Sequence, residues 1–143
     1  MLTIEQMNSH TRETLVGHLG IEFTVSEDGY VEATMPVDER TIQSYGYLHG
    51  GATIALAETV AGVGTFSIAL PEKSCVGMQI SASHISSART GEIVVAKGQI
   101  VHRGKSTHVW DVNIYAKDDD RLISTIRVTN AIVKNRNPNV FAE

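Results

Sequence analysis

The chain of 143 residues is poor in cysteine and proline and has no excess of basic side chains. Its single cysteine, Cys75, excludes an intrachain disulfide and has no partner residues at the spacing of a zinc motif. Free cysteines are usually small buried residues, so Cys75 is expected to pack near the start of a strand. The formal net charge of −4 argues against binding of nucleic acid or of an anionic membrane surface. An anionic ligand would have to be met by a few local basic residues.

Long uninterrupted hydrophobic runs are also missing. The longest apolar segment, residues 52–70, is interrupted by Glu58 and several glycines, which argues against a membrane span. The N-terminus lacks a basic region followed by an apolar run, so no signal peptide is expected and the cytoplasm is the expected compartment. No metal or cofactor is expected, because four of the histidines lack the spacing of a shared metal site: His10, His18, His102 and His108.

The sequence does contain enough hydrophobic residues, 42% of the chain, for one globular domain with its own core. It has no internal repeat and no interdomain linker, so residues 1–143 are expected to form a single domain. Thr3 and Gln6 form a capping box that predicts an amphipathic helix over about residues 3–15. The polar tail, about residues 134–143, is expected to be frayed.

The pattern of the remaining chain predicts six strands and one long helix. Residues 51–70 are rich in small and apolar residues on every side, which predicts a buried helix. Segments with strand character and turn signals between them cover residues 21–26, 30–37, 76–84, 93–101, 108–116 and 122–133. This order predicts an α+β fold in which a curved antiparallel sheet wraps around one long central helix.

The stretch from Gln43 to Glu58 places a histidine and two glycines at the start of the central helix and one carboxylate inside it. A helix that begins at Gly50 and Gly51 directs free backbone N–H groups and the positive end of its dipole at whatever lies in front. Such a place can hold a carbonyl oxygen as negative charge develops on it. Glu58 is costly to bury among apolar neighbours unless it has a partner or a catalytic task. The two features together suggest a reaction site.

His49 and Glu58 are nine residues apart in the sequence. On a helix this spacing corresponds to roughly 13 Å along the axis and to nearly opposite faces. The two side chains cannot act together on one atom within one chain. Either one of them alone is catalytic, or the site is shared by two subunits of a symmetric dimer. The apolar character of the helix on every side favours the shared site.

Gln43, the segment 48–51 and Glu58 at these spacings, with a strand ending in His84, resemble the hot-dog-fold acyl-CoA thioesterases. The closest resemblance is to the bacterial branch that includes the 1,4-dihydroxy-2-naphthoyl-CoA thioesterase and the proofreading thioesterase of enterobactin synthesis. Other matching segments are residues 31–38, residues 76–84 and Val109-Trp110. The resemblance runs from about residue 17 to residue 133. It implies a hot-dog fold and a homo-oligomer, either a dimer or a dimer of dimers, since most members of the family are tetramers.

The resemblance also implies a role for each residue of the central stretch. Glu58 would be the nucleophile or the general base toward the thioester carbonyl. The Gly50 N–H would hold the oxyanion, while Gln43 and His49 would orient the thioester and the attacking water or leaving group.

Each of these residues also has a structural interpretation. Glu58 could be a structural carboxylate bonded to a neighbouring strand, His49 a residue that only starts the helix, and Gln43 a loop amide. Gly50-Gly51 could be a tight entry turn, which does not exclude the oxyanion role. In relatives a hydroxyl residue often follows the catalytic glutamate by one helical turn. This chain has Gly62 there, which leaves the manner of water activation open.

The residues expected to bind the coenzyme A arm fall into two groups. Four match family positions near the pantetheine and the nucleotide: Gly77, His84, Ser86 and Ser87. The second group lies in the loop over residues 102–107 and suits a pyrophosphate: Arg103, Gly104, Lys105 and Ser106. The alternative for this loop is a solvated hairpin turn.

Three functions are compatible with these residues. The leading interpretation is hydrolysis of an aromatic or medium-chain acyl-CoA by a homo-oligomer that needs neither metal nor cofactor. A hot-dog hydratase or dehydratase also pairs a histidine with a carboxylate across subunits, and a non-catalytic acyl-CoA-binding protein would need no catalytic carboxylate. Gln43 and the segment 48–51 favour the thioesterase.

Overall fold

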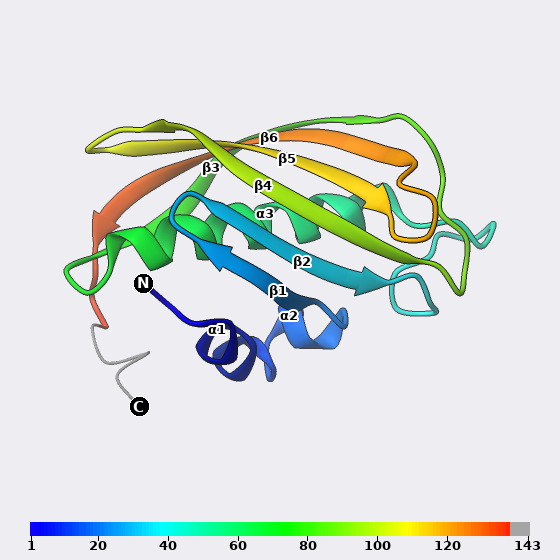
Figure 1. The fold of residues 1–143 in the computed structure, drawn as a ribbon, viewed down its shortest axis with the longest axis horizontal. Coiled ribbons are helices and arrows are strands. Elements are labelled where there is room, and N and C mark those ends of the chain that lie inside the picture. The colour runs from blue at the N-terminus through cyan, green and yellow to red at the C-terminus, as the bar shows by residue number, and fades with distance from the viewer. Residues whose placement is uncertain (138–143) are drawn as a thin grey trace.

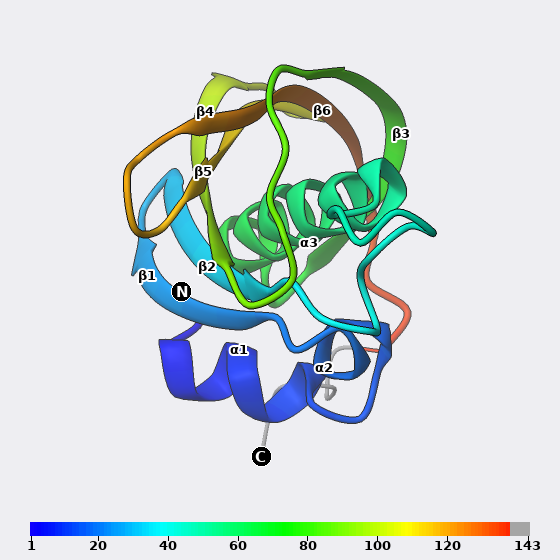
Figure 2. The same cartoon turned by 90° about the vertical axis from the view of Figure 1, so that its right-hand side faces the viewer.

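The computed structural model describes residues 1–137 and contains one long helix, α3 (Gly50–Ala69), around which a six-stranded sheet curves (Figures 1 and 2). The strands are β1 (Glu22–Glu27), β2 (Tyr30–Pro36), β3 (Lys73–His84), β4 (Ile93–Arg103), β5 (Thr107–Ala116) and β6 (Leu122–Lys134). All neighbouring strands are antiparallel, in the order β1-β2-β4-β5-β6-β3. The predicted α+β architecture, with one central helix and a curved antiparallel sheet, is confirmed.

The strand β3 occupies an edge of the sheet. It follows α3 in the chain but pairs with β6, the last strand, so that Gly77 lies opposite Asn130. The register shifts between Gly77 and Gln79, which is a bulge at Met78. Met78 and Val76 are 61% and 53% exposed. This edge of the sheet therefore combines an unpaired strand rim with exposed apolar side chains.

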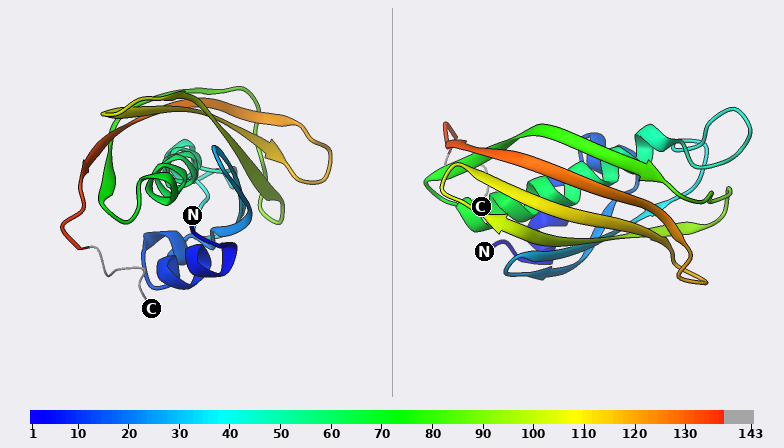
Figure 3. Two further views of the ribbon diagram at one scale, coloured as in Figure 1. Left: turned by 60° about the vertical axis from the view of Figure 1, so that its left-hand side comes forward. Right: turned by 90° about the horizontal axis from the view of Figure 1, so that it is seen from above.

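The helix α3 packs one face into the concave side of the sheet, as Figure 3 shows from the end and from above. Leu56, Val60 and Ala61 on this face are fully buried. Gly64 allows the closest approach, because a Cβ there would lie 2.5 Å from the Trp110 ring. The opposite face, which includes Glu58, stays open next to β3. The expectation of a helix buried on every side was therefore wrong for a single chain.

Length and composition alone would let α3 cross a membrane, and it is the one helix of the described residues that passes this test. Its burial under the sheet identifies it as the core helix of the fold.

The N-terminal segment forms two short helices beside β1, α1 (Ile4–Thr11) and α2 (Leu15–His18). The predicted capping box is confirmed, since Thr3 Oγ1 accepts from the Gln6 N–H and Gln6 Oε1 accepts from the Thr3 N–H. The predicted single helix over 3–15 was too long. The hydroxyl of Thr14 caps α2 by accepting from the Val16 N–H, which starts a new helix instead of continuing the first.

The C-terminal segment stays ordered further than expected. β6 includes Lys134, and the Asn135 side chain donates to the Pro71 carbonyl over 3.0 Å. The rest of the predicted frayed tail, residues 138–143, lies outside the described residues.

Candidate active site

The last residue of β3, His84, lies against the first residue of α3, Gly50. A Cβ on Gly50 would be 2.7 Å from His84 Nε2, so the imidazole covers the start of the helix. The other ring nitrogen, Nδ1, is 2.7 Å from the hydroxyl of Ser124, which is fully buried. This hydrogen bond holds the ring with Nε2 toward the helix N-terminus. Two predicted residues from separate elements thus meet at one place.

A pocket of about 250 Å³ opens in front of the N-terminus of α3. Five of the predicted site residues line it: Gln43, Gly50, His84, Ser86 and Ser87. Among the described residues, the N–H of Gly50 has no hydrogen-bond acceptor, as expected for the first residue of a helix. The pocket therefore receives an unused amide hydrogen and the positive end of a helix dipole.

His49 is the N-cap of α3. Its Nδ1 accepts a hydrogen bond of 2.8 Å from the N–H of Gly51, while its side chain is exposed. An Nδ1 that accepts is unprotonated, so the ring presents Nε2 to the solvent as its remaining polar atom. The predicted role as a residue that starts the helix and the predicted role toward a substrate are compatible, because they use different nitrogen atoms.

Gln43 precedes the pocket in a tight loop. Its backbone N–H donates to the Tyr47 carbonyl over 2.8 Å, and its Oε1 accepts from the N–H of Tyr45. The side-chain carbonyl is therefore occupied by the loop itself. The amide Nε2 is the part of Gln43 that can donate to a ligand in the pocket.

Glu58 lies two turns along α3 and away from this pocket. Its side chain is exposed in the single chain, not buried as its apolar neighbours in the sequence suggested. The carboxylate rests against β3 at Gly77, where an added Cβ would overlap Glu58 Oε1. Because residues 50–69 are helical, Glu58 and His49 are separated as the nine-residue spacing predicts. Within one chain, Glu58 and the pocket at the N-terminus of α3 are therefore separate from each other.

A buried polar cluster lies below Glu58, between α3 and the sheet. Thr65 Oγ1 accepts from Trp110 Nε1 at 2.8 Å and from Asn130 Nδ2 at 3.2 Å, and it lies 3.2 Å from His108 Nδ1. Burial lowers the pKa of His108, and the nearby Arg103 and His102 charges lower it further. No polar role was predicted for Trp110 or His108. Their shared face on β5 was the signal that they could meet one partner.

The loop over residues 102–107 does not join the pocket within one chain. Arg103 pairs with Asp28 at 2.9 Å, and the Ser106 carbonyl accepts from the N–H of Ile132 near the end of β6. Figure 1 shows this β4–β5 turn at the opposite end of the molecule from the N-terminus of α3. The predicted grouping of this loop with Ser86 and Ser87 is therefore not present in the single chain. Strand length, which the composition of the loop does not reveal, sets this separation.

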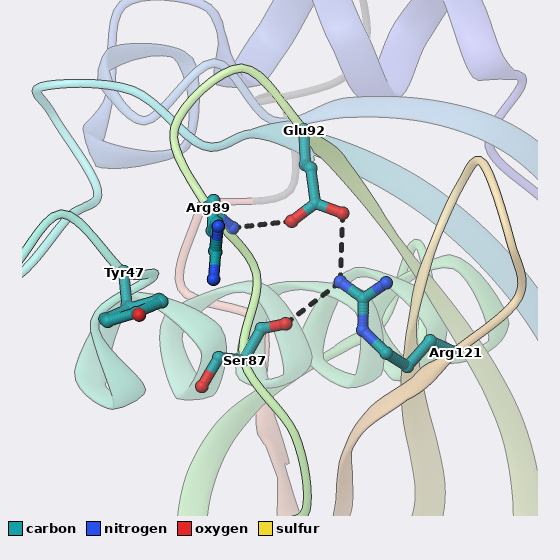
Figure 4. Close-up of a pocket in the computed structure, with 5 residues that line it drawn as sticks. All are labelled: Tyr47, Ser87, Arg89, Glu92 and Arg121. Carbon is teal, nitrogen blue, oxygen red and sulfur yellow. Dashed lines mark hydrogen bonds and ion pairs between the residues drawn. The ribbon is translucent and has the colours of Figure 1, made fainter.

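The structure has a second pocket, of about 510 Å³, that the sequence did not predict (Figure 4). It is lined by Tyr47, Ser87, Arg89, Glu92 and Arg121. Glu92 accepts from the N–H of Arg89 at 2.5 Å and from Arg121 Nη2 at 2.9 Å, and these contacts hold the pKa of its carboxyl below the ordinary value. Arg121 also donates to the Ser87 carbonyl over 2.9 Å.

The Arg89 guanidinium lies over the Tyr47 ring, 5.7 Å from its centroid. Within residues 1–137 it has no carboxylate partner, whereas Arg121 has two, Glu92 and Asp119. The second pocket therefore keeps one uncompensated positive charge. It shares Tyr47 and Ser87 with the pocket at the helix N-terminus, so the two are adjoining parts of one depression.

Cys75 behaves as a structural thiol. Its Sγ donates to the Gly62 carbonyl over 3.3 Å, and burial raises its pKa to about 11. The structure groups no three metal-ligating side chains in the part of the chain that it describes.

Comparisons with known proteins show the family to which this chain belongs. The family model of the thioesterase superfamily matches residues 45–123. The 1,4-dihydroxy-2-naphthoyl-CoA hydrolase of Escherichia coli is 39% identical over 92% of this chain and 96% of that protein. The proofreading thioesterase EntH of Cronobacter turicensis is 40% identical over 92% and 95%, respectively.

Solved structures agree with these relatives. A mutant of the thioesterase PA1618 from Pseudomonas aeruginosa has a TM-score of 0.88 at 34% identity, over 94% of this chain and 96% of that chain. A hypothetical thioesterase from Streptococcus pneumoniae in complex with coenzyme A has a TM-score of 0.74 at 27% identity, over 81% and 90%.

Proposed function

The chain belongs to the thioesterase superfamily and is a thioester hydrolase with the hot-dog fold, and we propose that its substrate is an acyl-CoA cleaved at a site shared by two copies of the chain. Family membership confirms the resemblance recognised in Gln43, the segment 48–51 and Glu58. We further propose an enzyme of the cytoplasm that works as a dimer or a dimer of dimers.

The observation that carries this proposal is the unused N–H of Gly50 beside His84 in the pocket at the N-terminus of α3. Attack on a thioester carbonyl develops negative charge on its oxygen. A fixed amide hydrogen at the positive end of a helix stabilises this charge with little reorganisation. His84 Nε2 and Gln43 Nε2 lie on the same pocket and can orient the thioester group.

The catalytic carboxylate has to come from a second chain. Glu58 lies on the open face of α3, beside the exposed edge strand β3 and its apolar Met78. Pairing two β3 edges across a two-fold axis would cover this face and set the two α3 helices antiparallel. Glu58 of one copy would then approach Gly50 of the other, and two equal sites would result.

The second pocket, with its Arg89 guanidinium, supports binding of the CoA arm next to the thioester site. With the thioester at the helix N-terminus, the arm can pass Ser87 and Tyr47 and place a phosphate beside Arg89. Arg89 carries the uncompensated charge, and a guanidinium is well suited to a phosphate. A relative of known structure that binds coenzyme A fits this assignment. The acyl group would lie between the two copies near Thr59, Gly62 and Met78, where an aromatic or medium-chain acid fits.

The reaction needs no strong acid for the leaving group. Glu58 would either take a proton from an attacking water or attack the carbonyl itself. The C–S bond of the tetrahedral intermediate then breaks and coenzyme A leaves as a thiolate. If Glu58 is the nucleophile, water afterwards hydrolyses the mixed anhydride between the acyl group and Glu58, which releases the acid. A hydratase would instead need an acid and a base placed on neighbouring carbons of an enoyl chain.

The test is a steady-state thiol-release assay on benzoyl-CoA and decanoyl-CoA, with hydration of crotonyl-CoA followed in parallel. We expect thiol release without hydration. Glu58→Gln should lower kcat by about 10²- to 10⁴-fold with the fold intact. Glu22→Gln, on an exposed strand position, is the control and should match the wild type. Hydration without thiol release would favour the hydratase, and binding without turnover would favour the acyl-CoA-binding protein.

A further inference from the structure

Asn130 on β6 carries a buried polar atom that has no partner. The residue is 1% exposed, and its Nδ2 donates to Thr65 Oγ1 over 3.2 Å. Its Oδ1 accepts no hydrogen bond from any described residue. A buried acceptor without a donor costs about 1–3 kcal/mol, so such an atom in a folded protein calls for an explanation.

The unpartnered oxygen faces the place where Glu58 meets β3. Gly77 lies opposite Asn130 in the sheet, and a Cβ on Gly77 would be 3.9 Å from Asn130 Oδ1 while overlapping Glu58 Oε1. Because position 77 has no side chain, the Glu58 carboxylate reaches the strand here, and two oxygen acceptors, Glu58 Oε1 and Asn130 Oδ1, both lie close to Gly77. A water molecule has two hydrogens, and it can donate one to each of them.

We propose that Asn130 is a positioning residue that orients the water molecule which Glu58 activates. This inference rests on the proposed function. One hydrogen of the water points to the Glu58 carboxylate and the other to Asn130 Oδ1, which leaves a lone pair for the thioester carbonyl. As the new C–O bond forms, Glu58 takes the first proton. The C–S bond then breaks, and the departing thiolate receives that proton.

The buried cluster explains why the amide of Asn130 keeps this orientation. Thr65 Oγ1 accepts from both Trp110 Nε1 and Asn130 Nδ2, so its own hydrogen is available for His108 Nδ1. The amide nitrogen is thereby fixed toward α3, and Oδ1 is turned toward Gly77. Gly62, one helical turn beyond Glu58, has no hydroxyl to bind the water. Asn130 supplies the missing second contact from the sheet.

The decisive variant is Asn130→Asp, which keeps the size of the side chain and adds a charge. A second carboxylate near Glu58 raises the pKa at which the pair ionises. We expect the acid limb of the kcat/KM profile to move up by about one pH unit or more, with kcat at least about tenfold lower and KM near the wild-type value. Asn113→Asp, on the outer face of β5, is the matched control and should leave the acid limb, kcat and KM unchanged.

Gly77→Ala is the second variant, because its Cβ would displace Glu58 Oε1 from beside Asn130 Oδ1 and leaves Asn130, Thr65 and Trp110 in place. We expect kcat to fall about tenfold or more while the melting temperature stays within a few degrees of the wild-type value. An Asn130→Asp protein that folds and keeps the wild-type kcat and acid limb overturns the inference. If that variant does not fold, an unchanged kcat in Gly77→Ala overturns it. A wild-type protein without thioesterase activity would refute the proposed function instead.

Discussion

His84 Nε2 sits 2.7 Å from the position that a Cβ of Gly50 would take, so the end of β3 and the start of α3 are in direct contact. The contact leaves no room for a side chain at position 50. It also places an imidazole next to the amide hydrogen that we assign to the oxyanion. The buried Ser124 hydroxyl holds the ring from behind.

Gly50→Ala should therefore impair catalysis without unfolding the protein. The added methyl must push the His84 ring away from the helix N-terminus, and it narrows access to the amide. Alanine keeps the backbone N–H, but the methyl group and the displaced ring hinder its approach to the substrate oxygen. We therefore expect kcat/KM to fall by about 10²-fold, as when one oxyanion donor can no longer be reached. Moving the ring weakens its hydrogen bond to Ser124, so we expect the melting temperature to fall by no more than about 5 °C. A variant with wild-type kcat/KM would contradict the oxyanion assignment.

The shared site predicts that two inactive variants restore each other. When Glu58→Gln and Gly50→Ala chains are refolded together at equal amounts, half of the dimers are mixed, and each mixed dimer has one site with both residues intact. We expect about one quarter of the wild-type activity in a thiol-release assay. Glu58→Gln refolded with Glu58→Ala is the control and should stay inactive. Absence of any restored activity in the first mixture would place the whole site within one chain.

Arg89→Gln should weaken binding of the CoA nucleotide and spare the chemical step. Loss of one charged contact to phosphate is worth about 1.4 kcal/mol or more, so KM for an acyl-CoA should rise about tenfold while kcat stays constant. With the same acyl group on truncated pantetheine, the variant and the wild type should have equal KM.

The matched control for Arg89 is Arg127→Gln, since Arg127 pairs with Asp111 on the sheet away from the pocket, at 2.8 Å. Arg127→Gln should leave the KM values for acyl-CoA and for the truncated pantetheine thioester unchanged. If Arg89→Gln and the wild type have equal KM values for acyl-CoA, the assignment of a CoA phosphate to this pocket is wrong.

Because His108 is buried, we expect the free energy of unfolding to fall in mild acid. Burial lowers its pKa below the ordinary value of 6.5, so the unfolded state binds a proton more readily than the folded state. The free energy of unfolding is unaffected above about pH 6.5 and falls below it, by up to about 1.4 kcal/mol per pH unit. Urea titrations of the wild type between pH 7.5 and 5.5 should show this decrease.

His108→Gln keeps an amide that can reach Thr65 and should flatten this pH dependence. His18→Gln, at an exposed position, is the control and should retain the decrease of the wild type. A wild type with constant stability from pH 7.5 to 5.5 would contradict the prediction.

Local sequence signals predicted the elements of this fold well. The predicted helix over 51–70 differs by one residue at each end from Gly50–Ala69, because Gly50-Gly51 and Pro71 mark the boundaries in the sequence itself. Between the predicted strands 21–26 and 30–37 the chain turns at Asp28-Gly29, and Gly29 has a φ of +80°, which glycine adopts readily. What a residue does within one helix or one turn is decided by its immediate neighbours in the chain.

The arrangement of elements was harder to predict, and so was half of the site. No local signal places β3 beside β6 at an edge, and this pairing is what exposes Glu58 and opposes Gly77 to Asn130. Arg89 and Asn130 belong to no motif. They acquire their surroundings only from strands and loops distant in the sequence.

The position of β3 also has a consequence for synthesis of the protein. A nascent chain on the ribosome completes α3 and β3 well before β6, the strand with which β3 pairs within the described part of the chain. Until Leu122–Lys134 has emerged, the residues of β3 have no ladder to join, and His84 has no Ser124 to hold its ring. We therefore expect catalytic competence to arise late and nearly all at once, when the C-terminal strand closes the sheet.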